Sequence, residues 1–268
     1  MKKFFLSLII LFFFPLSCAR SVINKSDSLR FVITGNTAPA SAFAGIPENL
    51  QRVIEQINAD NPVFVIHTGN MVRGGMGWMG INDNDVSRQY LEFLKSASMF
   101  NSLLYTLAGT RDGLNRSFDL YKKYMKRDLN YSFNYGNNHF IILNTANIRE
   151  IKQNEFEWLE KDLDNYRKCA AIFIITHRPV IAFPGMRIRY KDGEKLHKLF
   201  LKYPVKAVFS GSYSRFVDAA KDGIRYIIAG CGSFTEEDKY RFLYHYYVMN
   251  INETLSVEPR RLNKKFPL

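Results

Sequence analysis

The stretch FVIHTGNMVRGG, residues 64–75, decides the fold. It begins with the apolar run FVIH, which is typical of a strand buried on both faces of a parallel sheet. A loop bounded by glycines follows, and in parallel sheets enzymes usually keep their chemistry in such loops. The polar side chain at the tip of this loop is the neutral carboxamide of Asn70. The sequence therefore predicts a loop in a catalytic position without a charge at its tip.

Apolar strands and amphipathic helices alternate along the chain from Leu29 onward. Strand-like runs occupy residues 29–34, 63–68, 102–107, 139–145, 170–177, 205–210 and 224–230. Helical patterns occupy residues 48–59, 86–97, 117–127, 154–166 and 193–203. This alternation predicts a layered α/β domain over residues 29–257, followed by a basic C-terminal tail at 258–268.

The composition is that of one large domain. The chain has 268 residues, of which 47% are hydrophobic and 23% charged, and it contains no internal repeat. The formal net charge is +12, with basic runs at 121–127 and in the tail. The first run reads as the solvated face of a helix. No nucleic-acid motif accompanies either run, so nucleic acid is not expected as a partner, whereas the tail has the charge to bind anionic lipid.

The N-terminal stretch MKKFFLSLIILFFFPLSCAR has the organisation of a secretory signal. Two lysines precede an apolar run from Phe4 to Phe14, which is too short to span a bilayer, and small residues follow it. Two processing routes stay open. The segment PLSC resembles a bacterial lipobox ending at Cys18, although Pro15 stands where leucine is usual, and the rival is cleavage after Ala19.

Lipid attachment at Cys18 is the favoured route, because this cysteine follows the apolar run directly and a polar tether, residues 20–28, then leads to the first strand. We therefore expect residues 1–19 to be a signal peptide with a short processing region. The protein is expected to be exported to the cell envelope as a membrane-anchored lipoprotein. If cleavage follows Ala19 instead, the protein would be periplasmic or secreted.

Five of the predicted strands end in loops that carry glycine or polar residues. These loops are TGNT at 34–37, TGNM at 68–71, AGTRDG at 108–113, THRP at 176–179 and SGSYS at 210–214. In an open α/β sheet the carboxyl ends of the strands meet at one edge. We therefore expect these loops to line a common site, although they lie far apart in the sequence.

The order and spacing of these loops resemble those of the calcineurin-like metallophosphoesterases, whose pattern is D-x-H, G-D, G-N-H-[DE], a single H and G-H-x-H. The flanking segments 131–145, 153–163, 174–180 and 222–234 resemble family segments in the same order. The resemblance covers nearly all of the chain after the signal and implies a layered α/β/β/α sandwich. It also implies a pair of metal ions, held by carboxylates and imidazoles, whose hydroxide attacks a phosphate ester.

Most positions that the resemblance gives as ligand or catalytic residues are changed in this sequence. Asn36 and Asn70 stand for aspartates, Ala38 for a histidine, Thr110 for an asparagine, Arg111 for the histidine that assists the leaving group, and Ser212 and Ser214 for the two final histidines. Asp112 and His177 are retained. Neutral oxygens do not offset the desolvation of two cations, so no dinuclear metal cofactor is expected. A single weakly held divalent metal, with His177 as the residual ligand, stays open.

Two functions of different classes follow. The favoured one is a non-catalytic binding or scaffolding protein, a pseudoenzyme of the phosphoesterase fold, and the alternative is a phosphoester hydrolase with a remodelled or single-metal site. Arg73, Arg111 and Arg178 lie on or beside the predicted loops, so a phosphate-containing or other anionic ligand is an expected partner. Arg111 could instead pair with its neighbour Asp112 and leave no charge to offer.

The remaining histidines and cysteines have structural interpretations. The histidines that fall in strand patterns are His67, His139 and His245. His197 lies on a lysine-rich helix, where we expect it to be exposed. Cys169 and Cys231 fall at opposite ends of two strands that are expected to run parallel, so a disulfide between them is not expected.

Overall fold

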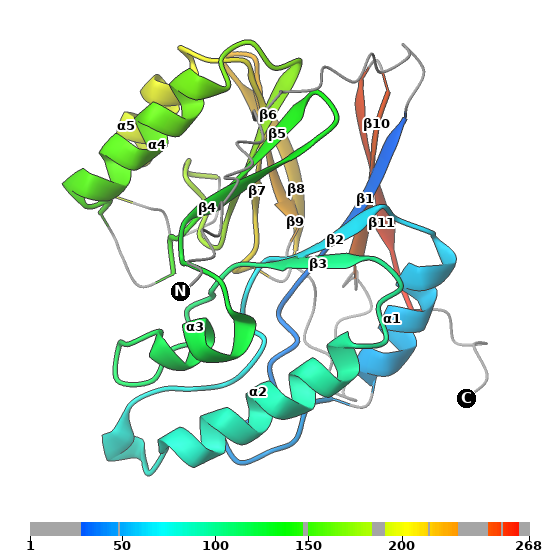
Figure 1. The fold of residues 1–268 in the computed structure, drawn as a ribbon, viewed down its shortest axis with the longest axis vertical. Helices are drawn as coiled ribbons and strands as arrows, with labels where there is room; N and C mark the ends of the chain where they lie inside the picture. Colours follow the sequence, from blue (N-terminus) through cyan, green and yellow to red (C-terminus); the bar gives the residue numbers. More distant parts are fainter. Residues whose placement is uncertain are drawn as a thin grey trace, which may run out of the picture.

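The computed structural model describes residues 28–47, 49–146, 150–183, 191–213, 215–229, 246–252 and 254–262. Two β-sheets pack face to face at its centre, and helices cover the outer face of each sheet (Figure 1). The predicted α/β/β/α sandwich is therefore confirmed.

One sheet has five strands in the order β11-β10-β1-β2-β3. Strand β1 (Leu29–Thr34) pairs in parallel with β2 (Phe64–His67), which pairs in parallel with β3 (Leu103–Thr106). On its other side β1 is antiparallel to β10 (Tyr246–Ile251), and β11 (Leu255–Arg260) forms the edge. Because β1, β2 and β3 run in one direction, the loops that follow them emerge at the same edge of the sheet.

The other sheet has six strands in the order β4-β5-β6-β7-β9-β8. The parallel strands are β5 (Asn138–Leu143), β6 (Ala171–Thr176), β7 (Val205–Ser210) and β9 (Ile224–Ala229). The antiparallel edge strands are β4 (Tyr131–Tyr135) and β8 (Phe216–Lys221).

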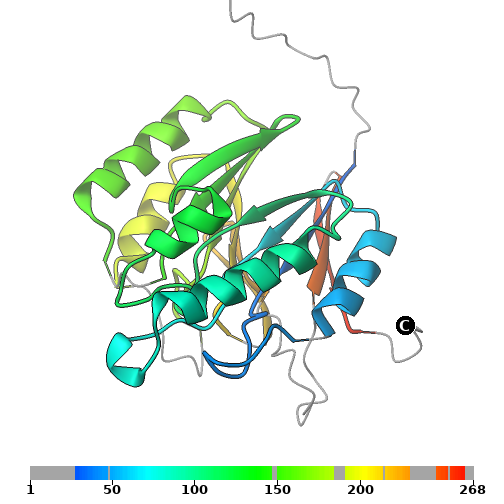
Figure 2. The ribbon, with the colours of Figure 1, turned by 60° about the horizontal axis from the view of Figure 1, so that its bottom comes forward.

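The helices lie on opposite outer faces of the sandwich (Figure 2). On the side of the five-stranded sheet are α1 (Asn49–Ala59), the short 3-10 helix η1 (Gly77–Met79), α2 (Asp83–Ala97) and α3 (Asp119–Met125). On the side of the six-stranded sheet are α4 (Gln153–Asn165) and α5 (Gly193–Phe200). Helix α2 begins with a capping box in which Asn82 and Asp85 bond to each other's backbone N–H groups, which fixes where the helix starts.

The core between the sheets is built from alternating strand residues. Phe31 of β1 stacks on Phe64 of β2 with ring centroids 5.1 Å apart. The same ring meets Phe140 of β5 and Phe209 of β7 edge-on, at 5.5 and 6.1 Å. The next residue, Val32, faces the opposite way and packs among residues of α1. Burial on both faces explains why the β1 sequence is a continuous apolar run.

Several strands of the structure are not among those predicted from the sequence. Strands β4, β8 and β11 each lie at the edge of a sheet. Strand β11 reaches Arg260, so the five-stranded sheet includes the first residues of the segment 258–268 that was expected to be a basic tail. None of the described helices combines the length and the apolar composition that crossing a bilayer requires.

The prediction that His197 is exposed is wrong. His197 is 1% exposed, because it lies on the inner face of α5. Its Nδ1 is 2.7 Å from the hydroxyl of Tyr226, and its Nε2 is 2.8 Å from a carboxylate oxygen of Asp222. The neighbouring lysines suggested an exposed position. However, His197 lies one helical turn from the buried residues Gly193 and Phe200, and so on the same face of α5.

Several predictions concern residues that the structure does not describe. The signal peptide, Cys18 and most of the tether precede the first described residue, and Cys231 and His245 also lie outside the described ranges. Cys169 is a free, partly buried thiol in the described part of the chain.

Candidate functional site

The loops after β1, β2, β3, β6 and β7 meet in one place, which we call the strand-tip site. It comprises residues 34–38, 68–74, 108–113, 176–178 and 210–213. The N–H of Asn36 donates to the carbonyl of Gly69 at 2.9 Å, which joins the first two loops. The Nδ1–H of His177 donates to the carbonyl of Thr68 at 2.8 Å, which joins the two sheets. Loops far apart in the sequence are thus held together, as their positions after parallel strands predicted.

Two glycines allow the second and third loops to approach each other. A Cβ atom on Gly69 would lie 2.5 Å from the backbone nitrogen of Gly109, and one on Gly109 would lie 2.3 Å from the backbone nitrogen of Asn70. Gly69 also has a φ of +96°, which L side chains rarely adopt. A side chain at either position would push the β2 and β3 loops apart.

The centre of the strand-tip site is held by two buried carboxamides. Nδ2–H of Asn70 donates to Oδ1 of Asn36 at 2.8 Å, and Oδ1 of Asn70 accepts the backbone N–H of Arg111 at 2.9 Å. Asn36 and Asn70 have φ values of 55° and 59°, in the left-handed region that asparagine tolerates better than most residues. The polar atoms of Asn70 are therefore satisfied by protein groups.

The carboxylate of Asp112 is fully buried and ties the β2 and β3 loops together. Its Oδ2 accepts the N–H groups of Asn70 and Gly109 at 2.7 and 2.6 Å, and its Oδ1 accepts those of Met71 and Val72 at 2.7 and 3.0 Å. Burial raises the pKa of Asp112 to about 6, against the effect of these four donors, so the carboxylate is ionised at neutral pH. Four donors occupy the lone-pair positions of a carboxylate, so Asp112 acts as a structural anchor.

Two buried histidines lie beside the site and are neutral at pH 7. Burial, with smaller contributions from Arg178 and Arg111, lowers the pKa of His177 to about 4. Burial and the proximity of His177 lower the pKa of His67 to about 3. Because Nδ1 of His177 carries the proton, its Nε2 is an acceptor, and it accepts a long hydrogen bond of 3.5 Å from the Thr110 hydroxyl.

The predicted arginines differ in their contacts. Nε–H of Arg178 donates to the carbonyl of Ala146 at 2.8 Å, so the protein already uses this group. Arg111 is exposed, and within the described residues its guanidinium makes no hydrogen bond or ion pair; in particular, it does not pair with Asp112. Nε of Arg73 is buried and also lacks a partner among the described residues.

The remaining predicted positions contribute little chemistry. Ala38 is 4% exposed and carries no polar side-chain atom. Ser212 follows β7 with a φ of 65°, and Ser214 lies outside the described residues.

Two residues of α2 support the site and were not predicted. The backbone N–H of Arg73 donates to Oε1 of Gln89 at 2.8 Å, and the hydroxyl of Tyr90 donates to the carbonyl of Asp112 at 2.7 Å. Both side chains are fully buried. The sequence could have indicated these residues in one way. Gln89 and Tyr90 are adjacent, both have hydrogen-bonding groups, and they lie on an amphipathic helix that follows a strand-tip loop.

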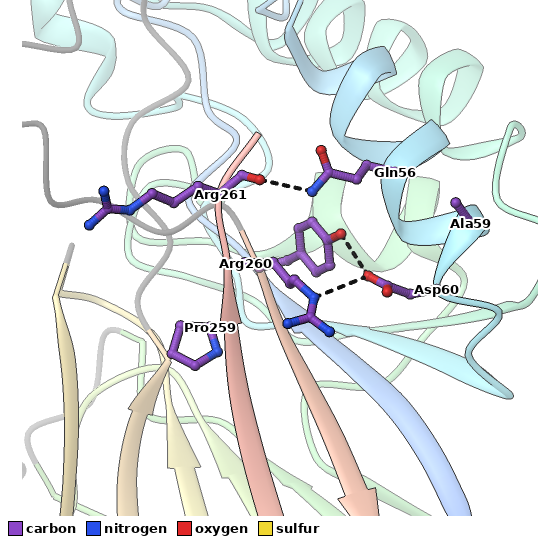
Figure 3. Close-up of a pocket in the computed structure, with 7 residues that line it drawn as sticks. Gln56, Ala59, Asp60, Pro259, Arg260 and Arg261 are labelled. Carbon is purple, nitrogen blue, oxygen red and sulfur yellow. Dashed lines mark hydrogen bonds and ion pairs between the residues drawn. The ribbon is translucent and has the colours of Figure 1, made fainter. Parts of the chain in front are cut away.

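A cavity of about 320 Å³ lies away from the strand-tip site, beside α1, β10 and β11 (Figure 3). The hydroxyl of Tyr246 donates to Asp60 at 2.7 Å, and Nε of Arg260 lies 3.8 Å from the same carboxylate. Nε2–H of Gln56 donates to the carbonyl of Arg261 at 2.8 Å. Because these groups satisfy one another, the cavity does not present an unpaired charge that would recognise a ligand.

The described residues contain no group of three or more His, Cys, Asp or Glu side chains that could hold a metal ion. The fold has two packed sheets, with polar loops at the ends of parallel strands. The Calcineurin-like phosphoesterase profile matches residues 30–211, which is more than half of the chain. The chain belongs to this family.

Solved structures share the fold at low sequence identity. A dimetal phosphatase from Danio rerio is 11% identical, with a TM-score of 0.67, and the match covers 88% of this chain and 96% of that one. A purple acid phosphatase from yellow lupin (Lupinus luteus) seeds is 17% identical, with a TM-score of 0.63 and coverage of 89% and 52%.

A third similar structure is the protein described as the anchor in the inner membrane complex of Plasmodium. It is 16% identical, with a TM-score of 0.59, and the match covers 88% of this chain and 85% of that one. Among proteins with curated descriptions, none matches this sequence.

Proposed function

We propose that this family member is exported, anchored by a lipid at Cys18, and binds its ligand without hydrolysing it. The observation that carries the proposal is the buried hydrogen bond between Asn70 and Asn36 at the centre of the strand-tip site. Two neutral groups that satisfy each other occupy the positions where the sequence resemblance gives metal-binding aspartates.

The other residues at the site support the same proposal. A pair of divalent cations needs several anionic or imidazole ligands to offset the loss of its hydration. Ala38 offers no ligand atom, and the oxygens of Asp112 already accept backbone N–H groups. The described residues therefore do not fit a dinuclear metal centre.

The fold is compatible with a role other than hydrolysis. One protein of this fold is described as the anchor in the inner membrane complex of Plasmodium, and we propose an anchored, non-catalytic role for this chain as well. The N-terminal signal with Cys18 supports placement of the domain at a membrane surface.

A second candidate, a single-metal phosphoester hydrolase, is favoured by one observation. Nε2 of His177 is an unprotonated acceptor inside the site, because Nδ1 donates to the carbonyl of Thr68, and it accepts a long hydrogen bond of 3.5 Å from the Thr110 hydroxyl. An imidazole oriented in this way by a backbone carbonyl is a common arrangement for a metal ligand.

Metal analysis and phosphatase assays separate the candidates. The purified chain would be incubated with Mn²⁺ or Zn²⁺, dialysed, and assayed with p-nitrophenyl phosphate. We expect well below one metal per chain and no hydrolysis above background. Nearly two metals per chain with metal-dependent hydrolysis would reject the proposal. One metal per chain that His177→Ala removes, together with hydrolysis, would establish the second candidate.

A further inference from the structure

Arg73 and Arg111 come from different loops but lie on neighbouring segments. The N–H of Gly74 donates to the carbonyl of Arg111 at 2.7 Å. One residue further along, the carbonyl of Gly75 accepts the N–H of Asn115 at 2.8 Å. The two segments thus run side by side at the edge of the strand-tip site, with an arginine on each.

The positive charges of Arg73 and Arg111, carried on these neighbouring segments, act on each other. Partial burial lowers the pKa of Arg111, and the positive charge of Arg73 is the next largest cause. Asp112 acts in the opposite direction, but its carboxylate is bound by backbone N–H groups and makes no ion pair with either arginine. Two like charges therefore stand together without a carboxylate partner in the described part of the chain.

The side chain of Arg73 has a buried hydrogen-bond donor without an acceptor in the described part of the chain. Its Nε is buried and has no acceptor among the described residues. A buried donor without an acceptor is unfavourable, and arginine can neither accept a hydrogen bond nor lose its proton in a protein. An acceptor supplied from outside would satisfy this donor, and a negatively charged one would also relieve the repulsion between the arginines.

We propose that Arg73 and Arg111 form a binding site for a doubly charged oxyanion, namely phosphate or the phosphate group of a monoester. Two guanidinium groups match two negative charges, and their forked donors suit the oxygens of a tetrahedral anion. This assignment rests on the proposed function, since it names the ligand that the site holds without hydrolysing it. Arg178 is not a member of the pair, because its Nε–H donates to the carbonyl of Ala146.

Calorimetric titration of the metal-free chain in EDTA tests the assignment. The probes are inorganic phosphate, phenyl phosphate, and dimethyl phosphate, which carries a single charge. We expect the first two to bind and the diester to bind at least about tenfold more weakly. Arg73→Gln and Arg111→Gln should each weaken phosphate binding by about tenfold to a hundredfold, because each removes charge-assisted hydrogen bonds.

Lys122→Gln is the matched control. Lys122 is exposed on α3, and its replacement removes the same charge from the surface, so this variant should bind phosphate as the wild type does. Arg73→Lys keeps the charge but loses the forked donors, and its affinity should fall between those of the wild type and Arg73→Gln. Melting curves without phosphate check folding, and both glutamine variants should melt no lower than the wild type because the repulsion is removed.

The outcomes separate this assignment from the proposed function. Absence of phosphate binding to the wild type, or binding by both glutamine variants that is as tight as that of the wild type, overturns the anion site and leaves the non-catalytic proposal standing. Binding that depends on both arginines, accompanied by metal-dependent hydrolysis of phenyl phosphate, would retain the anion site and reject the non-catalytic proposal.

Discussion

Asn70 donates its Nδ2–H to Oδ1 of Asn36 across 2.8 Å in the buried centre of the strand-tip site. The same carboxamide accepts the backbone N–H of Arg111. One neutral side chain therefore joins the loops after β1, β2 and β3 through hydrogen bonds to uncharged groups.

Replacing Asn70 should destabilise the protein more than its backbone conformation alone explains. Asn70→Ala loses both side-chain hydrogen bonds and leaves buried polar groups unpaired, so we expect a loss of about 3 kcal/mol in the free energy of unfolding. Asn61→Ala is the control, because Asn61 also has a left-handed φ, 49°, but is exposed. Its loss should be about 1 kcal/mol. Equal losses in urea unfolding would show that the hydrogen bonds contribute nothing.

Asp112→Asn should be among the most damaging single-atom changes in the chain. A carboxamide turns one hydrogen-bond acceptor into a donor that faces backbone N–H groups, so at least one pair of donors would be left without an acceptor. We expect a loss of about 3 kcal/mol or more at pH 7.5. Asp128→Asn, at an exposed position, should change stability by less than about 0.5 kcal/mol. A small effect at Asp112 would contradict its role as the anchor of two loops.

The contact between the two sheets can be tested at Phe31. Phe31→Ala empties a site that rings from both sheets surround, and the expected loss is about 3–5 kcal/mol. Phe43→Ala makes the same chemical change at a side chain that is 62% exposed, and should have an effect within about 0.5 kcal/mol. Chemical denaturation of both variants measures the difference.

Acid should destabilise the folded protein through His67. The folded pKa is about 3 and the ordinary value is 6.5, so as pH falls the unfolded chain takes up this proton first. The contribution of neutral His67 to the free energy of unfolding is complete above pH 6.5, and it is lost as the pH falls toward 3. Between pH 6.5 and 4 the loss from this one group should be about 3 kcal/mol.

His67→Asn tests that prediction. Nδ1 of His67 accepts the N–H of Gly69 at 3.2 Å, and an asparagine oxygen is a comparable acceptor that does not titrate in this range. The variant should therefore show a weaker dependence of unfolding free energy on pH than the wild type. The contribution of Asp112 is common to both proteins and cancels in the comparison, and that of His177 cancels except for its electrostatic interaction with His67. Parallel pH profiles for the two proteins would refute the role given to His67.

Lipid attachment at Cys18 predicts that cells labelled with a fatty-acid probe incorporate it into the wild-type chain. Cys18→Ser should abolish labelling, because the acceptor thiol is gone. Cys169→Ser removes another cysteine and should leave labelling unchanged. Equal labelling of Cys18→Ser and the wild type would favour cleavage after Ala19.

The strands that the sequence did not reveal have a common physical cause. β4, β8 and β11 are all edge strands, paired on one side only and half-exposed. Such strands tolerate charged residues and proline, as at Glu258 and Pro259 of β11, so their sequences lack the apolar run that made β1 and β2 easy to predict. The alternation of strands and helices did not indicate that the strands form two sheets. That prediction came from the resemblance to the calcineurin-like metallophosphoesterases.

The candidate site was predictable in its location but not in its contacts. The loop sequences and the order of strands place Asn36, Asn70 and Asp112 together. They do not reveal that Asp112 is saturated by backbone N–H groups, because those donors come from turn geometry. The neighbourhood of Arg73 and Arg111 depends on a backbone hydrogen bond between two loops, which no local pattern records.

The pairing of β1 with β10 has a consequence for the order in which the molecule can form. The register joins Leu29 to Ile251 and Thr34 to Tyr246, so the first strand to be synthesised finds one of its two neighbours near the other end of the chain (Figure 1). Until β10 has emerged, one side of β1 offers unpaired N–H and C=O groups to any other extended chain. Contacts of such long sequence separation form slowly, so a nascent or truncated chain that lacks β10 should require protection from aggregation.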